Sequence, residues 1–228
     1  MKKERIKLIL WIIMIFVGVA ISYKLPHDSY AIIQYIIKPI EYPHGSITLS
    51  GLVPLILFVI AIKGIVNLEI FAKKNKLAII LVIFIIVIPL MRWTIDFART
   101  DYYVITNAGI NSLDINTASI SFNNTNNKET MNVNLQVKDY GLKNRKFRVR
   151  VYIPQSLNDF TDLEYIDLPD EFTSHGYRST QTIQQEISID QGSIKDENIL
   201  TSSEWYFEDA TYVLYNENQE VKIIQHGN

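Results

Sequence analysis

Residues 77–93 read LAIILVIFIIVIPLMRW, and no polar side chain occurs between Leu77 and Met91. A helix needs about 20 predominantly apolar residues to cross the roughly 30 Å hydrocarbon layer of a bilayer. The length and uniform hydrophobicity of this run predict a transmembrane helix over about residues 77–93. The run lies near the end of the first hundred residues, and no comparable apolar run follows it.

Two further apolar runs precede this one, and they predict transmembrane helices over about residues 6–23 and 47–66. Lys63 is the only charge within the second of these runs, and it lies close enough to the end for its amine to reach the headgroups. The first run also fits a cleaved signal peptide, because it has a basic start and the sequence Ala20-Ile21-Ser22 resembles a small-x-small cleavage site.

Charge divides the chain into a membrane domain at residues 1–100 and a second domain at residues 101–228. The first domain holds 12 Lys/Arg and 5 Asp/Glu, a net charge of +7, and the second holds 10 and 19, a net charge of −9. Within the first domain, residues 30–40 are too short an apolar stretch to cross and predict an interfacial helix.

The distribution of basic residues predicts the orientation of the chain. Seven basic residues flank one side of the predicted spans: Lys2, Lys3, Arg5, Lys7, Lys73, Lys74 and Lys76. Four flank the other side: Lys24, Lys38, Arg92 and Arg99. Because the more basic side usually faces the cytoplasm, the N-terminus is expected in the cytoplasm and residues 101–228 outside it.

The second domain shows the period-two alternation of half-buried strands. Residues 131–138 read MNVNLQVK and residues 147–153 read FRVRVYI, with a polar turn between them. Further strands are expected at Tyr102–Thr106, Ser119–Asn123, Glu164–Leu168, Thr182–Ile189, Ala210–Tyr215 and Glu220–Gln225. About eight short strands predict an antiparallel sandwich, broadly similar in architecture to immunoglobulin or fibronectin-III modules but without the cysteine pair of antibody domains. The predicted fold class is an α+β membrane protein, with three N-terminal transmembrane helices followed by this all-β sandwich.

The sequence carries no motif for catalysis or for a cofactor. It contains no cysteine, which excludes disulfides, thiolate nucleophiles and cysteine-bound metals. The four histidines are scattered, and neither HExxH, GxSxG, a P-loop nor GxGxxG is present. The protein is therefore predicted to be no enzyme and to use no cofactor, and the acidic second domain disfavours binding to nucleic acid.

The densest cluster of acidic residues offers weak candidates for a metal site: Asp159, Asp162, Asp167 and Asp170. Calcium takes six to eight oxygen ligands, and carboxylates this close in sequence can supply several of them. The spacing does not match an EF-hand loop, however, and no glycine marks its sharp turn. A solvated acidic surface is the competing interpretation.

A mixed aromatic and basic surface is the candidate for binding: Phe160, Tyr165, Arg148, Arg150 and Tyr152. Arg148, Arg150 and Tyr152 alternate along one strand and so share a face, which can attract anionic groups. The simpler account is that these arginines pair across the sheet with carboxylates of their own domain.

The preferred functional hypothesis is a multi-pass cell-membrane protein that displays a non-enzymatic binding module outside the cytoplasm. Its expected partners are the lipid bilayer and another membrane or envelope protein. The alternative is a subunit of a transport or channel complex, for which Lys63 is the one intramembrane ionisable candidate. A metal-dependent surface hydrolase that uses the acidic cluster is a third hypothesis.

Overall fold

The computed structural model describes residues 2–42, 45–125, 128–153, 163–189 and 210–226. Two compact units make up the chain. The first, here the helical unit, comprises Met1–Leu25, Tyr30–Ile40 and Ile47–Ala98. The second, here the β unit, comprises Pro26–Ser29, Glu41–Ser46 and Arg99–Asn228. The units interleave along the chain, since two short segments from the first fifty residues belong to the β unit.

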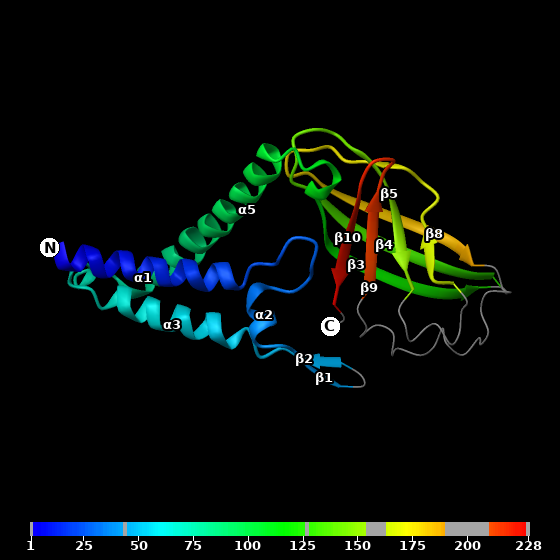
Figure 1. Ribbon diagram of the computed structural model, residues 1–228. Coiled ribbons are helices and arrows are strands. Elements are labelled where there is room, and N and C mark those ends of the chain that lie inside the picture. The colour runs from blue at the N-terminus through cyan, green and yellow to red at the C-terminus, as the bar shows by residue number, and fades with distance from the viewer. Residues whose placement is uncertain (1, 43–44, 126–127, 154–162, 190–209, 227–228) are drawn as a thin grey trace. The chain divides into compact units, whose positions relative to one another are not determined.

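The helices of the first hundred residues are α1 (Lys2–Ile21), α2 (Ile32–Ile36), α3 (Leu52–Val66), the 3-10 turn η1 (Glu69–Phe71), α4 (Lys76–Val82), the π-helical segment η2 (Ile83–Val87) and α5 (Ile88–Ile105). Two three-residue strands, β1 (Ile40–Tyr42) and β2 (Gly45–Ile47), pair with each other. The segments α4, η2 and α5 follow one another without a break, so that residues Lys76–Ile105 form one helix of 30 residues. Figure 1 shows α1 and α3 lying alongside each other.

Glycines allow α1 and α3 to pack closely. A side chain on Gly64 of α3 would overlap the indole ring of Trp11 on α1, and a Cβ on Gly18 of α1 would come within 2.8 Å of Phe58 on α3. The buried residues around this contact are Ile15, Val19, Ala61, Ile65 and Ile83. Small residues thus let large ones fill the interface from both sides, as in closely packed helix pairs.

The prediction of three N-terminal transmembrane helices is wrong. Among the described residues, only the helix Lys76–Ile105 is long and apolar enough to cross a membrane. Helix α1 includes Lys2, Lys3, Glu4, Arg5 and Lys7, so its uncharged part, 8–21, extends only about 21 Å at 1.5 Å per residue. Helix α3 has 15 residues and reaches about 22 Å, because the helix begins only after Gly51.

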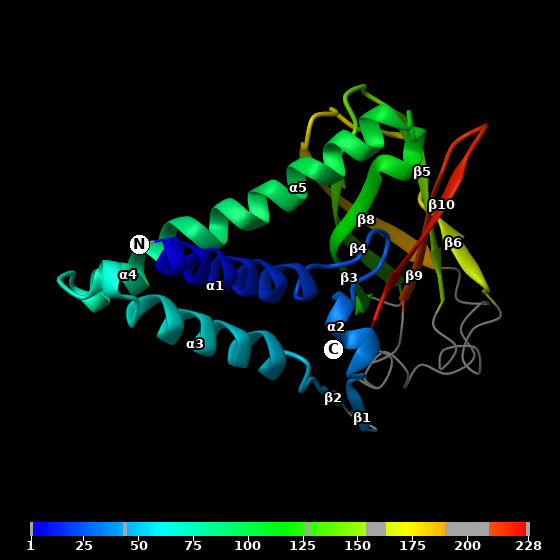
Figure 2. The same cartoon turned by 60° about the vertical axis from the view of Figure 1, so that its left-hand side comes forward.

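Among its described residues, the β unit contains the 3-10 turn η3 (Gly109–Ser112) and, besides most of β1 and β2, eight strands: β3 (Leu113–Thr125), β4 (Lys128–Asp139), β5 (Lys146–Tyr152), β6 (Tyr165–Asp167), β7 (Phe172–Thr173), β8 (Thr180–Ile189), β9 (Ala210–Tyr215) and β10 (Glu220–Gln225). Strands β3, β4 and β8 form one antiparallel sheet in that order. The second sheet has the order β10-β9-β5-β6, with β7 also paired to β5. Figure 2 shows the β9–β10 hairpin beside β5.

One hydrophobic core lies between the two sheets. Strand β4 contributes Met131, Val133, Leu135 and Val137, and β5 contributes Phe147, Val149 and Val151, all at most 2% exposed. Alternate residues of each strand face this core, as the period-two pattern predicts. The strands β9 and β10 also coincide with the predicted ranges, whereas Tyr102–Thr106, predicted as a strand, belongs largely to the last turns of α5.

Candidate binding face

One face of the second sheet gathers arginine and tyrosine side chains. The residues of β5 that point away from the core are Lys146, Arg148, Arg150 and Tyr152. Antiparallel pairing places Arg148 opposite Tyr215 of β9, and it places Arg150 and Tyr152 opposite Asp167 and Tyr165 of β6. We call the set Arg148, Arg150, Tyr152, Tyr165 and Tyr215 the Arg–Tyr face.

Arg150 is the centre of this face. Its Nε and Nη2 donate to the two carboxylate oxygens of Asp167, at 2.8 and 3.0 Å, which is the paired geometry that best fixes a guanidinium. The same guanidinium lies 4.1 Å from the ring centroid of Tyr165 and 5.2 Å from that of Tyr215. Tyr165 also contacts Tyr152, with ring centroids 5.8 Å apart. Carboxylate and rings together hold Arg150 in one orientation.

The basic residues on and beside this face differ in whether they have an ion-pair partner. Hydrogen bonds from Arg150 lower the pKa of Asp167, so this carboxylate stays ionised and neutralises Arg150. Lys146 forms an exposed ion pair with Glu171 at 2.8 Å. Arg148 is exposed and forms no ion pair with any residue that the structure describes. Among the described residues, Arg148 is thus the arginine of this face without an ion pair, although Glu171 and Glu217 line the same groove.

An open polar groove adjoins the Arg–Tyr face at the beginning of β5. It has a volume of about 780 Å³ and includes Arg148 and Tyr215 among its lining residues. Asn144 also lines it, as do Asn216 and Asn218 of the β9–β10 turn. The groove thus extends the face with amide groups that can both donate and accept hydrogen bonds.

The structure describes two of the four predicted metal candidates, Asp167 and Asp170. Asp159 and Asp162 lie outside the described residues, as does Phe160 of the predicted binding surface. Asp167 is engaged by Arg150, and Asp170 accepts a hydrogen bond from the side chain of Gln185. Within the described ranges, no group of three or more acidic or histidine side chains is placed to hold a metal ion.

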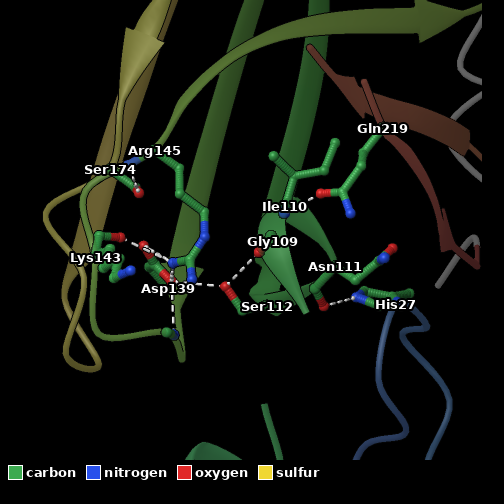
Figure 3. A network of polar contacts seen from close by, with 11 residues as sticks. His27, Gly109, Ile110, Asn111, Ser112, Asp139, Lys143, Arg145, Ser174 and Gln219 are labelled. Atoms are coloured by element: carbon green, nitrogen blue, oxygen red, sulfur yellow. Dashed lines mark hydrogen bonds and ion pairs between the residues drawn. The ribbon is translucent and has the colours of Figure 1, made fainter. Parts of the chain in front are cut away.

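A polar network stabilises the end of the β unit at which β5 begins (Figure 3). The carboxylate of Asp139, 1% exposed, accepts a hydrogen bond from the backbone N–H of Gly141 at 2.7 Å and lies 3.3 Å from the guanidinium of Arg145. The hydroxyl of Ser112 lies 3.0 Å from the same carboxylate, and the hydroxyl of Ser174 accepts from the backbone N–H of Arg145 at 3.1 Å. These contacts fix the turn that leads into the Arg–Tyr face.

A second buried ion pair lies in the β unit at the beginning of β3. The guanidinium of Arg99 contacts Asp114 at 2.7 Å and lies 4.1 Å from the ring centroid of Tyr140. The backbone N–H of His27 donates to the same carboxylate at 3.2 Å, and its Nε2 lies 2.9 Å from the carbonyl oxygen of Asn111. Burial lowers the pKa of His27, which favours the neutral imidazole.

Sequence reasoning missed both buried networks. No strand is predicted over 113–115, where alternation with the apolar Leu113 and Ile115 would place Asp114 at the surface. All three are at most 1% exposed. A short register shift after Ile115 interrupts the alternation there. The only indication of a buried charge in the sequence was Asp114 itself, a single acidic residue between two apolar ones.

Comparison with known proteins identifies no relative. No protein-family model matches the chain, and no curated protein and no solved structure is significantly similar to it. The functional argument therefore depends on the geometry of the chain itself.

Proposed function

We propose that this protein is anchored in the cell membrane by the helix Lys76–Ile105 and binds another envelope protein through the Arg–Tyr face of its β unit. The binding role is non-enzymatic. The observation that carries it is the arrangement of Arg150, which is held by a carboxylate and two tyrosine rings on a sheet face that remains accessible. Arginine and tyrosine are enriched among the residues that dominate binding energy at protein interfaces.

Two features support this choice of surface. Tyr165 is 41% exposed although it is large and partly apolar, so a partner that covers it removes apolar area from water. Because Asp167 and Tyr165 fix Arg150, the face loses little side-chain freedom on binding. The expected partner surface carries a carboxylate for Arg148 and an apolar patch for Tyr165.

The orientation of the helix supports an extracytoplasmic β unit. Lys73, Lys74 and Lys76 lie at the beginning of the helix Lys76–Ile105, and basic residues beside a span favour the cytoplasmic side. The β unit, which includes the last helical residues from Arg99, is then expected on the opposite side. Because Pro26–Ser29 also belongs to the β unit, this orientation requires the chain between Ser29 and Lys73 to return to the cytoplasmic side as well. A neighbouring membrane or envelope protein is within its reach there.

Photocrosslinking in intact cells tests the proposal. We expect a photoreactive residue at Tyr165 to yield a discrete crosslinked species, and the same residue at exposed Thr182 on β8 to yield none. In the protein with the photoreactive residue at position 165, the further substitution Arg148→Glu should abolish the crosslinked species. Lys143→Glu, an equal charge reversal outside the Arg–Tyr face, should leave the amount of crosslinked species unchanged. Identical crosslinks from Tyr165 and Thr182, or insensitivity to Arg148→Glu, would refute a specific role for this face.

A further inference from the structure

The helical unit contains a cavity of about 460 Å³. Its wall is made by side chains of α1, α3, η1, α4 and η2, among them Ile12, Ile65, Phe71 and Ile79. This volume lies within the range of about 300–1,000 Å³ typical of small-molecule sites. The cavity is open to its surroundings, and its apolar wall favours an apolar occupant, because water against it would find few hydrogen-bonding partners.

Two polar residues contribute to the lining, almost entirely through their apolar atoms. Ten of the twelve lining residues are apolar, and the two polar ones are the sequence neighbours Lys74 and Asn75. The side chain of Asn75 accepts a hydrogen bond from the backbone N–H of Leu77 at 2.9 Å and so caps the beginning of α4. Lys74 forms no ion pair with any described residue, and Lys73 and Lys76 add positive charge beside it. The wall is therefore almost wholly apolar, and the positive charges of Lys73, Lys74 and Lys76 lie beside one end of it.

The helix that forms part of this wall departs from α-helical geometry where it meets the cavity. Residues Ile83–Val87 are π-helical, and both Ile83 and Val87 line the cavity. Such π-helical turns are rare and occur frequently at functional sites. The same helix, Lys76–Ile105, is the candidate membrane span, with only 6% of its most apolar window buried. A lipid in the surrounding bilayer would have direct access to this side of the unit.

We propose that the cavity binds an acyl chain of an anionic lipid and that Lys74 binds its acidic headgroup. The apolar wall accounts for the chain, and the cationic end accounts for the charge of the headgroup. This proposal rests on the membrane anchoring described above for the source of the lipid, but it does not depend on the Arg–Tyr face.

The test uses the full-length protein in phosphatidylcholine nanodiscs and a fluorescent fatty acid, cis-parinaric acid, with empty nanodiscs as the blank. We expect saturable binding to the wild-type protein and its loss in Ala78→Phe, because Ala78 lines the cavity. The matched variant Ala72→Phe, at an exposed position outside the lining, should bind as the wild type does. Circular dichroism of both variants checks that the helices are intact.

The headgroup is tested with Lys74→Gln and, as its control, Lys73→Gln. Lys74→Gln should weaken binding of the fatty acid about fivefold, because one nearby basic residue contributes about that much to the binding of an anionic lipid. The same substitution should not change binding of the uncharged alcohol with the same chain. Lys73→Gln should weaken binding of the fatty acid less than Lys74→Gln does, and it should also leave binding of the alcohol unchanged. Normal binding to Ala78→Phe would overturn the site, and equal weakening by the two lysine variants would overturn the headgroup assignment.

Incorporation of the protein into nanodiscs, measured by co-elution, reports separately on membrane anchoring. A protein that co-elutes but does not bind the probe refutes the cavity and leaves the anchoring intact. A protein that does not co-elute refutes the anchoring.

Discussion

Asp114 and Glu171 each form an ion pair of nearly the same length, but their surroundings differ. Asp114 lies 2.7 Å from Arg99, and their side chains are 1% and 9% exposed. Glu171 lies 2.8 Å from Lys146, and their side chains are 43% and 72% exposed. Removing one charge from a buried pair leaves the other without compensation, whereas water replaces a lost partner at the surface.

We therefore expect Asp114→Asn to destabilise the β unit by about 3–5 kcal/mol, and Glu171→Gln by less than about 1 kcal/mol. Urea unfolding of the full-length protein in detergent, followed by circular dichroism, measures both changes. Equal effects of the two variants would contradict the assigned role of the Arg99–Asp114 pair.

His27 predicts a dependence of stability on pH. Burial lowers the pKa of His27, so the unfolded chain binds a proton at this residue more readily than the folded one does. The stability contributed by the neutral ring is fully present above the unfolded pKa of about 6.5, and it is lost as the pH falls toward the lower folded pKa. The carboxylate of Asp114 opposes the effect of burial but does not cancel it.

The variant His27→Asn should reduce this loss of stability on acidification below about pH 6.5. Asparagine is suited to the position because His27 has a φ of 60°, a left-handed conformation that asparagine tolerates. Melting temperatures of wild type, His27→Asn and, as a control at an exposed site, His175→Gln would be compared across pH 5–8. Curves for wild type and His27→Asn that remain parallel would exclude His27 as the source.

At the scale of elements, the contact between α1 and α3 depends on glycine. A Cβ on Gly64 would overlap Trp11, and both residues lie in the helix interior where neither backbone can yield easily. Gly51, at the beginning of α3, has no atom near the position of an added Cβ. Comparing glycine-to-alanine substitutions at Gly64 and Gly51 therefore separates the steric effect of an added Cβ from the effect of losing the flexibility of glycine.

We expect Gly64→Ala to destabilise the helical unit by about 1–3 kcal/mol, the usual cost of overpacking, despite the better helix propensity of alanine. Gly51→Ala should be neutral or stabilising. Thermal unfolding of the full-length protein in detergent, followed by circular dichroism, measures both variants. A stabilising Gly64→Ala would show that α1 and α3 do not pack closely at Trp11.

The elements differ in how well the sequence predicts them. Strands β9 and β10 flank a short polar turn and alternate without interruption, so both their type and their bounds follow from the pattern. The predicted transmembrane helices over 6–23 and 47–66 failed because α1 takes its charged residues into its own first turns and ends at Ile21, and because α3 begins only at Leu52. For α5, Tyr102 and Tyr103 favour strands locally but continue the helix to Ile105; Tyr103 is buried against Tyr140, and such a tertiary contact can outweigh the local preference.

On the scale of the whole molecule, the β unit is assembled from distant parts of the sequence. The backbone N–H of Ser29 donates to the carbonyl of Ile224 at 3.0 Å, and the N–H of Ile224 donates to the carbonyl of His27 at the same distance. No local pattern predicts a pairing across almost two hundred residues. The Arg–Tyr face was accessible to prediction because Arg148, Arg150 and Tyr152 alternate on one strand, whereas the partner residue Tyr215 was not.

The orientation of the whole molecule can be measured directly, because the chain contains no cysteine. Single cysteines would be introduced at Lys73, before the helix Lys76–Ile105, and at Leu142, which is 53% exposed in the β unit. A membrane-impermeant maleimide added to intact cells should label Leu142→Cys, and it should label Lys73→Cys only after permeabilisation, because a crossing helix separates the two sites. The reverse pattern would place the β unit in the cytoplasm, where an envelope partner is out of reach. Labelling of both sites in intact cells would show that the helix does not cross the membrane.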